Sequence, residues 1–349
     1  MATELETQLW ASADILRGKM DASEYKNYLL GLIFYKYLSD VELREVYEAE
    51  NGNNIEFPER EIMIETFKEW YEEDAHELEE MMKLQRNYFI APENLFYTFS
   101  KDPSFQLATL QKAFVLLSQQ SKQFSGLFDD IDLTSTKLGS NAQQRNTTLT
   151  QVIKALDEID LFAHEGDVIG DAYEYLIKQF ASSAGKKAGE FYTPQEVSKI
   201  ISEIVSIGQE DKIPFHIYDP AMGSGSLMLK IRHFMKEPSK IHYHGQELNT
   251  TTFNLGRMNL ILHGVDEGRM VINNGDTLDA DWPTDEPYQF DAVVMNPPYS
   301  ANWSAAEKFL SDPRFERFGK LAPKSKADFA FLLHGFYHLK DTGTMGIVL

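Results

Sequence analysis

The sequence predicts an α/β protein in which a doubly wound, mostly parallel sheet follows an all-helical N-terminal domain. Before about residue 160, apolar residues recur at helical spacing and no stretch has the character of a strand. After that point, short β-prone runs alternate with helical patterns, which is typical of parallel sheets with crossover helices. We therefore divide the chain into a helical domain, residues 1–160, and an α/β domain, residues 161–349.

The first domain is expected to contain helices alone. Helical periods cover residues 5–40, with a turn near Gly18, and residues 59–89, 105–117 and 149–161. The stretch at residues 133–151 is polar and low in hydrophobicity, so it predicts a long surface loop that leads into the last helix.

The second domain alternates strands with helices. The β-prone runs are FHIYD, IHYHGQEL, MVINNGD, FDAVVMN and TMGIVL, which begin at residues 215, 241, 270, 290 and 344. The helical patterns between them are GSLMLKIRHFMKE, TTFNLGRMNLILHG and KADFAFLLHGFYHLK. Ligands of such sheets bind beyond the carboxyl ends of the strands, so functional residues are expected there.

Composition excludes several kinds of chemistry. The 349 residues include no cysteine, which removes disulfides, thiolate nucleophiles and cysteine-ligated zinc. His334 and His338 are spaced like paired ligands on a helix, but no glutamate follows the first, so we expect ordinary core or surface histidines and no metal. No apolar run approaches the roughly 18 residues of a membrane span and no secretory signal is visible, so we expect a cytoplasmic protein.

The net charge of −21, with a pI of about 4.8, makes the chain repel the phosphates of nucleic acids. A role on DNA would therefore require a local basic patch or a partner subunit that supplies positive charge. Acidic residues are dense between Val41 and Glu80, where interleaved apolar residues at helical spacing indicate solvated helix faces.

The first strand end carries a loop suited to a nucleotide-type cofactor. Asp219 closes the strand, Gly223 and Gly225 allow a tight turn with close backbone approach, and Ser226 opens a helical pattern. The loop is not a P-loop, because no Gly-Lys-Ser/Thr follows, and it lacks the full G-x-G-x-x-G spacing. Taken alone, it is equally consistent with a tight structural turn.

Acidic residues at the next two strand ends support the same interpretation. Glu247 lies 28 residues after Asp219, where it is placed to accept hydrogen bonds from ribose hydroxyls. Asp276 could accept a hydrogen bond from an adenine amino group, and a polar turn residue is the alternative there.

Two prolines end the fourth strand. Pro297 and Pro298 lack an amide N–H and have a fixed φ, so they stop strand pairing and hold the chain rigid beyond Asn296. The Asn296 side-chain oxygen and the Pro297 carbonyl could then accept hydrogen bonds from one NH2 group, while Tyr299 offers a face to a planar ring. A structural turn is the alternative, but the upstream loop and acidic position favour a site.

Together these motifs closely resemble those of S-adenosylmethionine-dependent adenine-N6 DNA methyltransferases, in which N-P-P-Y is the catalytic motif. The run GKKAGEFYTPQEV at residues 185–197 resembles the family's F-Y-T-P cofactor motif, and its place before the glycine loop matches the γ order. GDVIGDAYEYLIKQF, KSKADFAFLLHGFYHLK and the helical N-terminal domain resemble the modification (M) subunit of type I restriction-modification enzymes. The resemblance covers essentially the whole chain and implies a Rossmann-like methyltransferase domain.

The resemblance also implies residue roles. Asn296, Pro297 and Tyr299 would receive a flipped adenine. The amino acid and sulfonium region of S-adenosyl-L-methionine would be held by the first strand end, namely Asp219, Gly223, Ser224, Gly225 and Ser226. Glu247 would bind its ribose and Asp276 its adenine. The methionine end would be lined by Glu190, Phe191, Tyr192, Thr193, Pro194 and Gln195.

The same resemblance implies partners. Two M subunits would join one specificity (S) subunit, giving an M2S1 complex that acts on double-stranded DNA, and a restriction (R) subunit is a further possible partner. The helical domain would help close the complex around DNA. Such subunits are expected to continue through later strands and a C-terminal helical tail, whereas this sequence ends at Leu349 in a strand-like run. The alternatives are methylation of a protein glutamine or of RNA, or a non-catalytic assembly subunit.

Overall fold

The chain folds as two compact units, Met1–Leu176 and Ile177–Leu349. The computed structural model describes residues 3–52, 56–161, 166–183, 192–279, 289–299 and 301–349. The division between the units falls within helix α8 (Gly166–Ser183). The domain boundary after residue 160 stays a prediction. No helix in the described ranges is both long and apolar enough to cross a membrane.

The regular structure in the described part of the first unit is helical. Its helices are α1 (Glu4–Ser12), α2 (Asp14–Arg17), α3 (Ala22–Asn51), α4 (Arg60–Arg86), α5 (Phe96–Lys101), α6 (Leu107–Ser118), α7 (Ala142–Asp157) and most of α8. Its core is aromatic around Tyr35 of α3, whose ring packs against those of Phe99, Phe114 and Phe128. The Tyr35 hydroxyl donates a hydrogen bond to the Asn94 carbonyl, so this buried polar group is satisfied.

The prediction of a long loop at residues 133–151 is wrong for its second half, because α7 begins at Ala142. The Asn141 side chain accepts a hydrogen bond from the backbone N–H of Gln144 and so caps the helix. Leu149 and Val152 are fully buried. The polar residues that suggested a loop occupy the first turns of a helix that is anchored by its later apolar residues.

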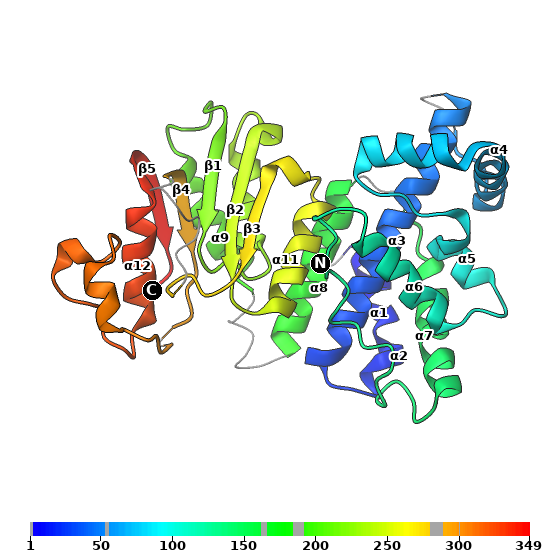
Figure 1. Ribbon diagram of the computed structural model, residues 1–349, viewed down its shortest axis with the longest axis horizontal. Helices are drawn as coiled ribbons and strands as arrows, with labels where there is room; N and C mark the ends of the chain where they lie inside the picture. Colours follow the sequence, from blue (N-terminus) through cyan, green and yellow to red (C-terminus); the bar gives the residue numbers. More distant parts are fainter. Residues whose placement is uncertain (1–2, 53–55, 162–165, 184–191, 280–288, 300) are drawn as a thin grey trace. The chain divides into compact units, whose positions relative to one another are not determined.

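The second unit contains a five-stranded sheet in the order β3-β2-β1-β4-β5, which Figure 1 shows side by side. The strands are β1 (Phe215–Asp219), β2 (Ile241–Glu247), β3 (Met270–Asn274), β4 (Phe290–Met295) and β5 (Leu339–Ile347). All four strand pairs of this sheet are parallel. The doubly wound α/β fold predicted from the alternating pattern is therefore confirmed.

Helices cover both faces of the sheet. Helices α9 (Gln195–Ser206), α10 (Ser226–Leu229) and α11 (Thr250–Leu262) share one buried cluster with strand residues such as Ile217 and Val294. Helix α12 (Ala327–Tyr337) packs on the other face with Tyr218 and Val293. Neighbouring residues of one strand therefore enter opposite cores, as the two-residue period of a strand requires.

Two elements of this unit differ in length from the prediction. The helix expected at residues 225–237 is α10, of four residues, followed by a 3-10 helix at Lys230–Phe234. Strand β5 begins at Leu339 and not at residue 344, because Leu339 pairs with Phe290. Lys340, a charged residue near the start of β5, forms an ion pair with buried Asp291.

Candidate active site

The strand order brings the predicted site residues to one edge of the sheet. β1 pairs with β2 on one side and with β4 on the other, so the carboxyl ends of these strands are neighbours. Asp219 ends β1, Glu247 ends β2 and Asn296 directly follows β4. The turn that carries Asp276 follows β3, the next strand along. The chain reverses its winding direction at β1, which is where doubly wound sheets bind ligands.

The glycine loop after β1 is a tight turn fastened to β2. Gly223 and Gly225 have φ values of +54° and +75°, in the left-handed region that favours glycine. The Gly225 N–H donates to the Met222 carbonyl at 2.8 Å, and the Gly223 N–H donates to Oε2 of Glu247 at 3.0 Å. Glu247 therefore fixes the loop as well as lying at the predicted ribose position.

The two serines of the loop point into the protein. Ser224 and Ser226 are buried, and their hydroxyls lie 3.0 Å apart. Asn259 of α11 donates to the Ser224 carbonyl at 3.0 Å. Any contact that these serines make with a ligand at this edge would therefore come from backbone groups rather than from hydroxyls.

Helix α11 supplies two residues that the sequence interpretation missed. Asn259 is fully buried and bonds to the glycine loop. Gly256 allows α11 to approach, because a Cβ there would lie 2.6 Å from Met222 Cε and 2.9 Å from the Gly223 carbonyl oxygen. The sequence feature that could have indicated their role is a glycine and an asparagine within the apolar helical pattern TTFNLGRMNLILHG.

Two carboxylates of this edge, Asp219 and Glu247, are poorly solvated. Asp219 is 1% exposed, and burial raises its pKa to about 8, although the hydrogen bond from the Ala221 N–H opposes the shift. Burial also raises the pKa of Glu247. Buried acceptors that lack a cation favour ligands offering ammonium or hydroxyl donors.

Asp276 is exposed and takes part in a turn. Its Oδ1 accepts hydrogen bonds from the N–H groups of Leu278 and Asp279 at 2.9 and 3.3 Å. The Thr277 hydroxyl donates to the Pro220 carbonyl at 2.6 Å, which ties this turn to the loop after β1. A carboxylate has further acceptor capacity on its second oxygen, so the turn is compatible with a ligand contact.

The Asn-Pro-Pro-Tyr corner meets the F-Y-T-P motif. Asn296 Nδ2 donates to Thr193 Oγ1 at 3.3 Å, across 103 positions of sequence. On its other side, Asn296 Oδ1 accepts a hydrogen bond from the Tyr299 hydroxyl. Pro297 is buried, whereas Tyr299 is 51% exposed. Among the described residues, no backbone N–H donates to the Pro297 carbonyl.

Two further residues of the F-Y-T-P motif lie at the start of α9. Pro194 is the N-cap residue of this helix and Gln195 is its first residue. Tyr192 is half-buried. Glu190 and Phe191 lie outside the described residues.

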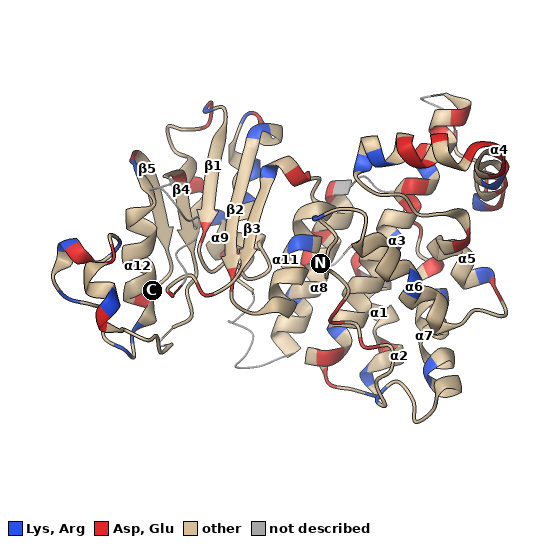
Figure 2. Cartoon of the chain, viewed as in Figure 1, with Lys and Arg blue, Asp and Glu red and all other residues tan. Residues whose placement is uncertain are grey.

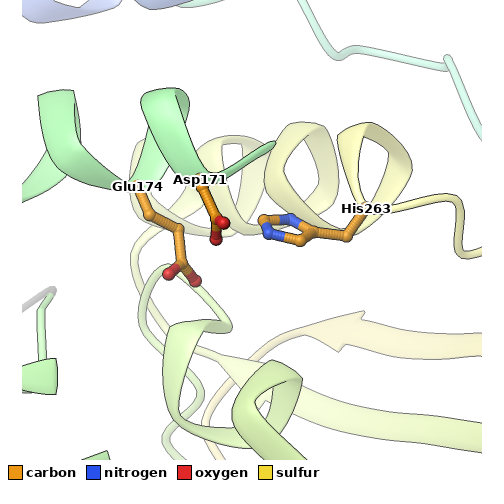
Figure 3. A group of neighbouring side chains, drawn as sticks. All are labelled: Asp171, Glu174 and His263. Carbon is orange, nitrogen blue, oxygen red and sulfur yellow. The ribbon is translucent and has the colours of Figure 1, made fainter. Parts of the chain in front are cut away.

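Other histidines and acidic residues lie on α8, on α12 and at the ends of α11 and α12. His334 and His338 are fully buried on α12 and at its end, and His334 Nε2 lies 2.8 Å from the Tyr218 hydroxyl. Figure 3 shows Asp171 and Glu174 projecting from α8, and His263 at the end of α11. The two carboxylates belong to the first unit and His263 to the second, where its Nδ1 lies 2.9 Å from the Asn259 carbonyl.

Known families match both parts of the chain. The N-6 DNA Methylase family matches residues 164–349, and the HsdM N-terminal domain family matches residues 5–156. The chain is 37% identical, over 99% of its length, to the type I restriction enzyme MpnII methylase subunit of Mycoplasma pneumoniae, and covers 67% of that protein. The chain belongs to the methylase subunits of type I restriction enzymes. The resemblance inferred from its motifs is thus confirmed.

Further relatives of this type I methylase subunit agree. The crystal structure of the type I restriction-modification system methyltransferase subunit from Streptococcus thermophilus is 51% identical, with a TM-score of 0.94, and the match covers 98% of this chain and 73% of that one. The MjaIX methylase subunit of Methanocaldococcus jannaschii is 27% identical over 100% of this chain. The type I methylase subunit described here spans 61% of that relative's length.

Proposed function

We propose that this type I methylase subunit transfers a methyl group from S-adenosylmethionine to N6 of an adenine flipped out of double-stranded DNA. The observation that carries the proposal is that Asn296 follows β4, directly beside the glycine loop of β1. A cofactor held at the loop and a base held at the corner would then lie at neighbouring strand ends.

The residues at the sheet edge fit the proposed cofactor. S-adenosylmethionine, when bound, supplies a methyl group that is activated by a sulfonium. Asp219 would accept a hydrogen bond from the ammonium of the cofactor. This contact would place a positive charge beside a buried carboxylate. Glu247 offers acceptors for ribose hydroxyls and Asp276 an acceptor for the adenine amino group. Thr193 would line the methionine end behind Asn296.

The corner fits a planar base with an exocyclic amine. Flipping the base costs a few kcal/mol, and stacking on the exposed Tyr299 ring would recover about 1 to 3 kcal/mol. Asn296 Oδ1 and the Pro297 carbonyl would accept the two N–H groups of the amine. These acceptors favour a tetrahedral nitrogen and stabilise the positive charge that develops on it. The proton lost after transfer can go to water, so no strong base is required.

Sequence specificity would come from a separate S subunit, with two M subunits and one S subunit in the complex, and an R subunit would be a further partner. The family assignment supports this organisation. The net charge of −21 supports it as well, because so acidic a chain repels DNA phosphates and would bind the duplex more tightly with a partner that binds DNA. The helical unit would contribute to subunit assembly and closure around DNA.

The substitution Asn296→Ala tests the catalytic assignment. It should lower methylation by at least about 100-fold, since removal of one preorganised group that stabilises transition-state charge typically has this effect. Cofactor affinity, measured by calorimetry, should change little. The control is Asn51→Ala, because the Asn51 amide donates to the Tyr47 carbonyl in the helical unit. Unaltered turnover in Asn296→Ala would refute the assignment.

Incorporation of labelled methyl groups tests the substrate. Unmethylated duplex DNA should become labelled at N6 of adenine when the chain is assembled with its S subunit, and much less without it. Label on RNA or on a protein glutamine would favour another amine or amide substrate, and no label on any of them would indicate an assembly role.

A further inference from the structure

The segment that follows Tyr299 carries an excess of positive charge in a chain whose net charge is −21. Residues 301–326 contain six Lys and Arg but three Asp and Glu. Residues 317–326, called the basic segment below, contain Arg317, Lys320, Lys324 and Lys326 and no acidic residue. In Figure 2, the chain that leads into α12 carries several positions coloured as Lys or Arg, together with a few coloured as Asp or Glu.

Backbone hydrogen bonds hold the end of the basic segment beside the Asn-Pro-Pro-Tyr corner. The Ala327 N–H donates to the Ala301 carbonyl at 3.0 Å, and the Trp303 N–H donates to the Lys324 carbonyl at 3.0 Å. Lys324 is therefore bonded to Trp303, and Lys326 directly precedes the residue that is bonded to Ala301. Since α12 connects parallel β4 to β5, its N-terminus lies at the carboxyl edge of the sheet, as Asn296 does.

Packed side chains and hydrogen bonds hold the region that contains the basic segment. The rings of Trp303, Phe309 and Phe315 pack against one another. Buried Arg314 donates to the carbonyls of Thr277 and Leu278 at 2.8 and 3.1 Å, which fastens this region to the turn after β3. The lysines are thus presented from a fixed scaffold that also contacts the candidate active site.

Among the residues that the structure describes, the lysines of the basic segment form no ion pairs. Lys320, Lys324 and Lys326 are exposed. Lys308, earlier in the same region, does pair with Asp279. Lys326 is also the N-cap residue of α12, whose first turn contains Asp328.

We propose that the basic segment binds phosphates of the DNA strand that carries the flipped adenine, with Lys324 and Lys326 as contacts. The inference rests on the proposed function and adds where the duplex backbone lies. A flipped nucleotide remains joined to its strand, so the flanking phosphates must pass close to Tyr299. Closely spaced, exposed lysines suit a row of phosphates, which they bind without regard to sequence.

The test compares two double variants of the chain assembled with its S subunit. Lys324→Gln/Lys326→Gln removes the proposed contacts. Lys236→Gln/Lys240→Gln removes the same charge from exposed lysines that precede β2, at the opposite edge of the sheet. Both DNA affinity across a salt series and steady-state methylation are measured, together with co-elution of the S subunit.

The first variant should lower the slope of log affinity against log salt concentration by about 1.8, since each phosphate contact contributes about 0.9. KM for DNA should rise by roughly 10-fold at low salt, with kcat and cofactor affinity unchanged. The control should match the unsubstituted protein, and Lys324→Arg/Lys326→Arg should retain most of the affinity.

An unchanged slope and KM would overturn the inference. Loss of S-subunit co-elution in the first variant would also overturn it, because the segment would then dock a protein. The salt slope is a binding measurement, so it tests the inference even if the unsubstituted complex methylates no DNA, which is the outcome that refutes the proposed function.

Discussion

At the scale of single residues, the side chain of Asn296 is held from both sides. Thr193 accepts from its amide nitrogen, which turns its oxygen toward the exposed Tyr299. The Tyr299 hydroxyl donates a hydrogen bond to that oxygen. Under the proposed function, the incoming base must displace this hydroxyl, and Tyr299 then exchanges a hydrogen bond for stacking.

Substitution of Tyr299 separates these two roles. Tyr299→Phe keeps the ring and frees Asn296 Oδ1, so kcat/KM for DNA should stay within about threefold of the unsubstituted value or rise. Tyr299→Ala loses stacking of about 1 to 3 kcal/mol, so kcat/KM should fall roughly 5- to 150-fold. Steady-state methylation kinetics measure both. Equal damage by the two substitutions would show that the hydroxyl matters and the ring does not.

Asp219 should make the ligand-free protein lose stability as pH rises. Burial raises the pKa of this carboxyl from 3.8 in the unfolded chain to about 8. Between those values the folded state keeps a proton that the unfolded state releases, so the free energy of unfolding decreases as pH increases. The decrease is at most about 1.4 kcal/mol per pH unit from this group.

Asp219→Asn should remove this dependence and be more stable than the unsubstituted protein at pH 9 without cofactor, while binding cofactor more weakly. Urea denaturation between pH 5 and pH 9 measures the effect. Asp211→Asn is the control, since Asp211 is an exposed carboxylate in an ion pair with Lys236. If both variants kept the dependence of the unfolding free energy on pH that the unsubstituted protein shows, the pKa of Asp219 would not be raised by folding.

At the scale of elements, the site depends on close packing between α11 and the glycine loop. Gly256 brings the helix against Met222 and Gly223, and Asn259 then bonds to the Ser224 carbonyl. The loop is thereby fixed from α11 on one side and from Glu247 of β2 on the other. A turn with two glycines would otherwise have wide conformational freedom.

Gly256→Ala should displace the glycine loop, because the added Cβ meets a backbone carbonyl oxygen as well as a flexible methionine. Overpacking of this kind costs about 1 to 3 kcal/mol. The melting temperature and the affinity for S-adenosylmethionine should therefore both fall. Gly268→Ala is the control, since a Cβ there comes only within 3.4 Å of the Asp266 carboxylate. Unchanged affinity in Gly256→Ala would mean that the loop does not need α11.

The mispredicted element ends have different causes. The start of α7 depends on a local cap by Asn141. The start of β5 depends on residues distant in sequence: Lys340 was assigned to the preceding helical pattern, yet it lies in β5, where Leu339 pairs with Phe290 and Lys340 forms an ion pair with Asp291. Local patterns carry no information on such partners, so element ends were less predictable than element types.

At the scale of the whole molecule, the charge distribution is consistent with the proposed function, in which another subunit would bind most of the DNA. The chain carries −21 overall, while its exposed cations beside the candidate active site suffice for a few phosphate contacts. Such contacts would position DNA that another subunit has already bound. Positioning and specificity would then reside in different chains.

The isolated chain should therefore bind random-sequence duplex weakly. Its Kd should lie within or above the range of roughly 10⁻⁴ to 10⁻⁶ M that is typical of non-specific binding at physiological salt. Fluorescence anisotropy with labelled duplex, with and without the S subunit, measures this. Submicromolar, strongly salt-dependent binding by the chain alone would contradict the expected dependence on a partner.

The amino-acid sequence by itself determined the alternation of strands and helices, the residues at the strand ends and the family, because period, turn chemistry and motif order are local properties. Only the tertiary structure decided that Thr193 holds Asn296, that Asn259 and Gly256 support the glycine loop, and that Lys324 lies beside the corner. These contacts join residues far apart along the chain. They arise when parallel strands align their carboxyl ends, which no local pattern specifies.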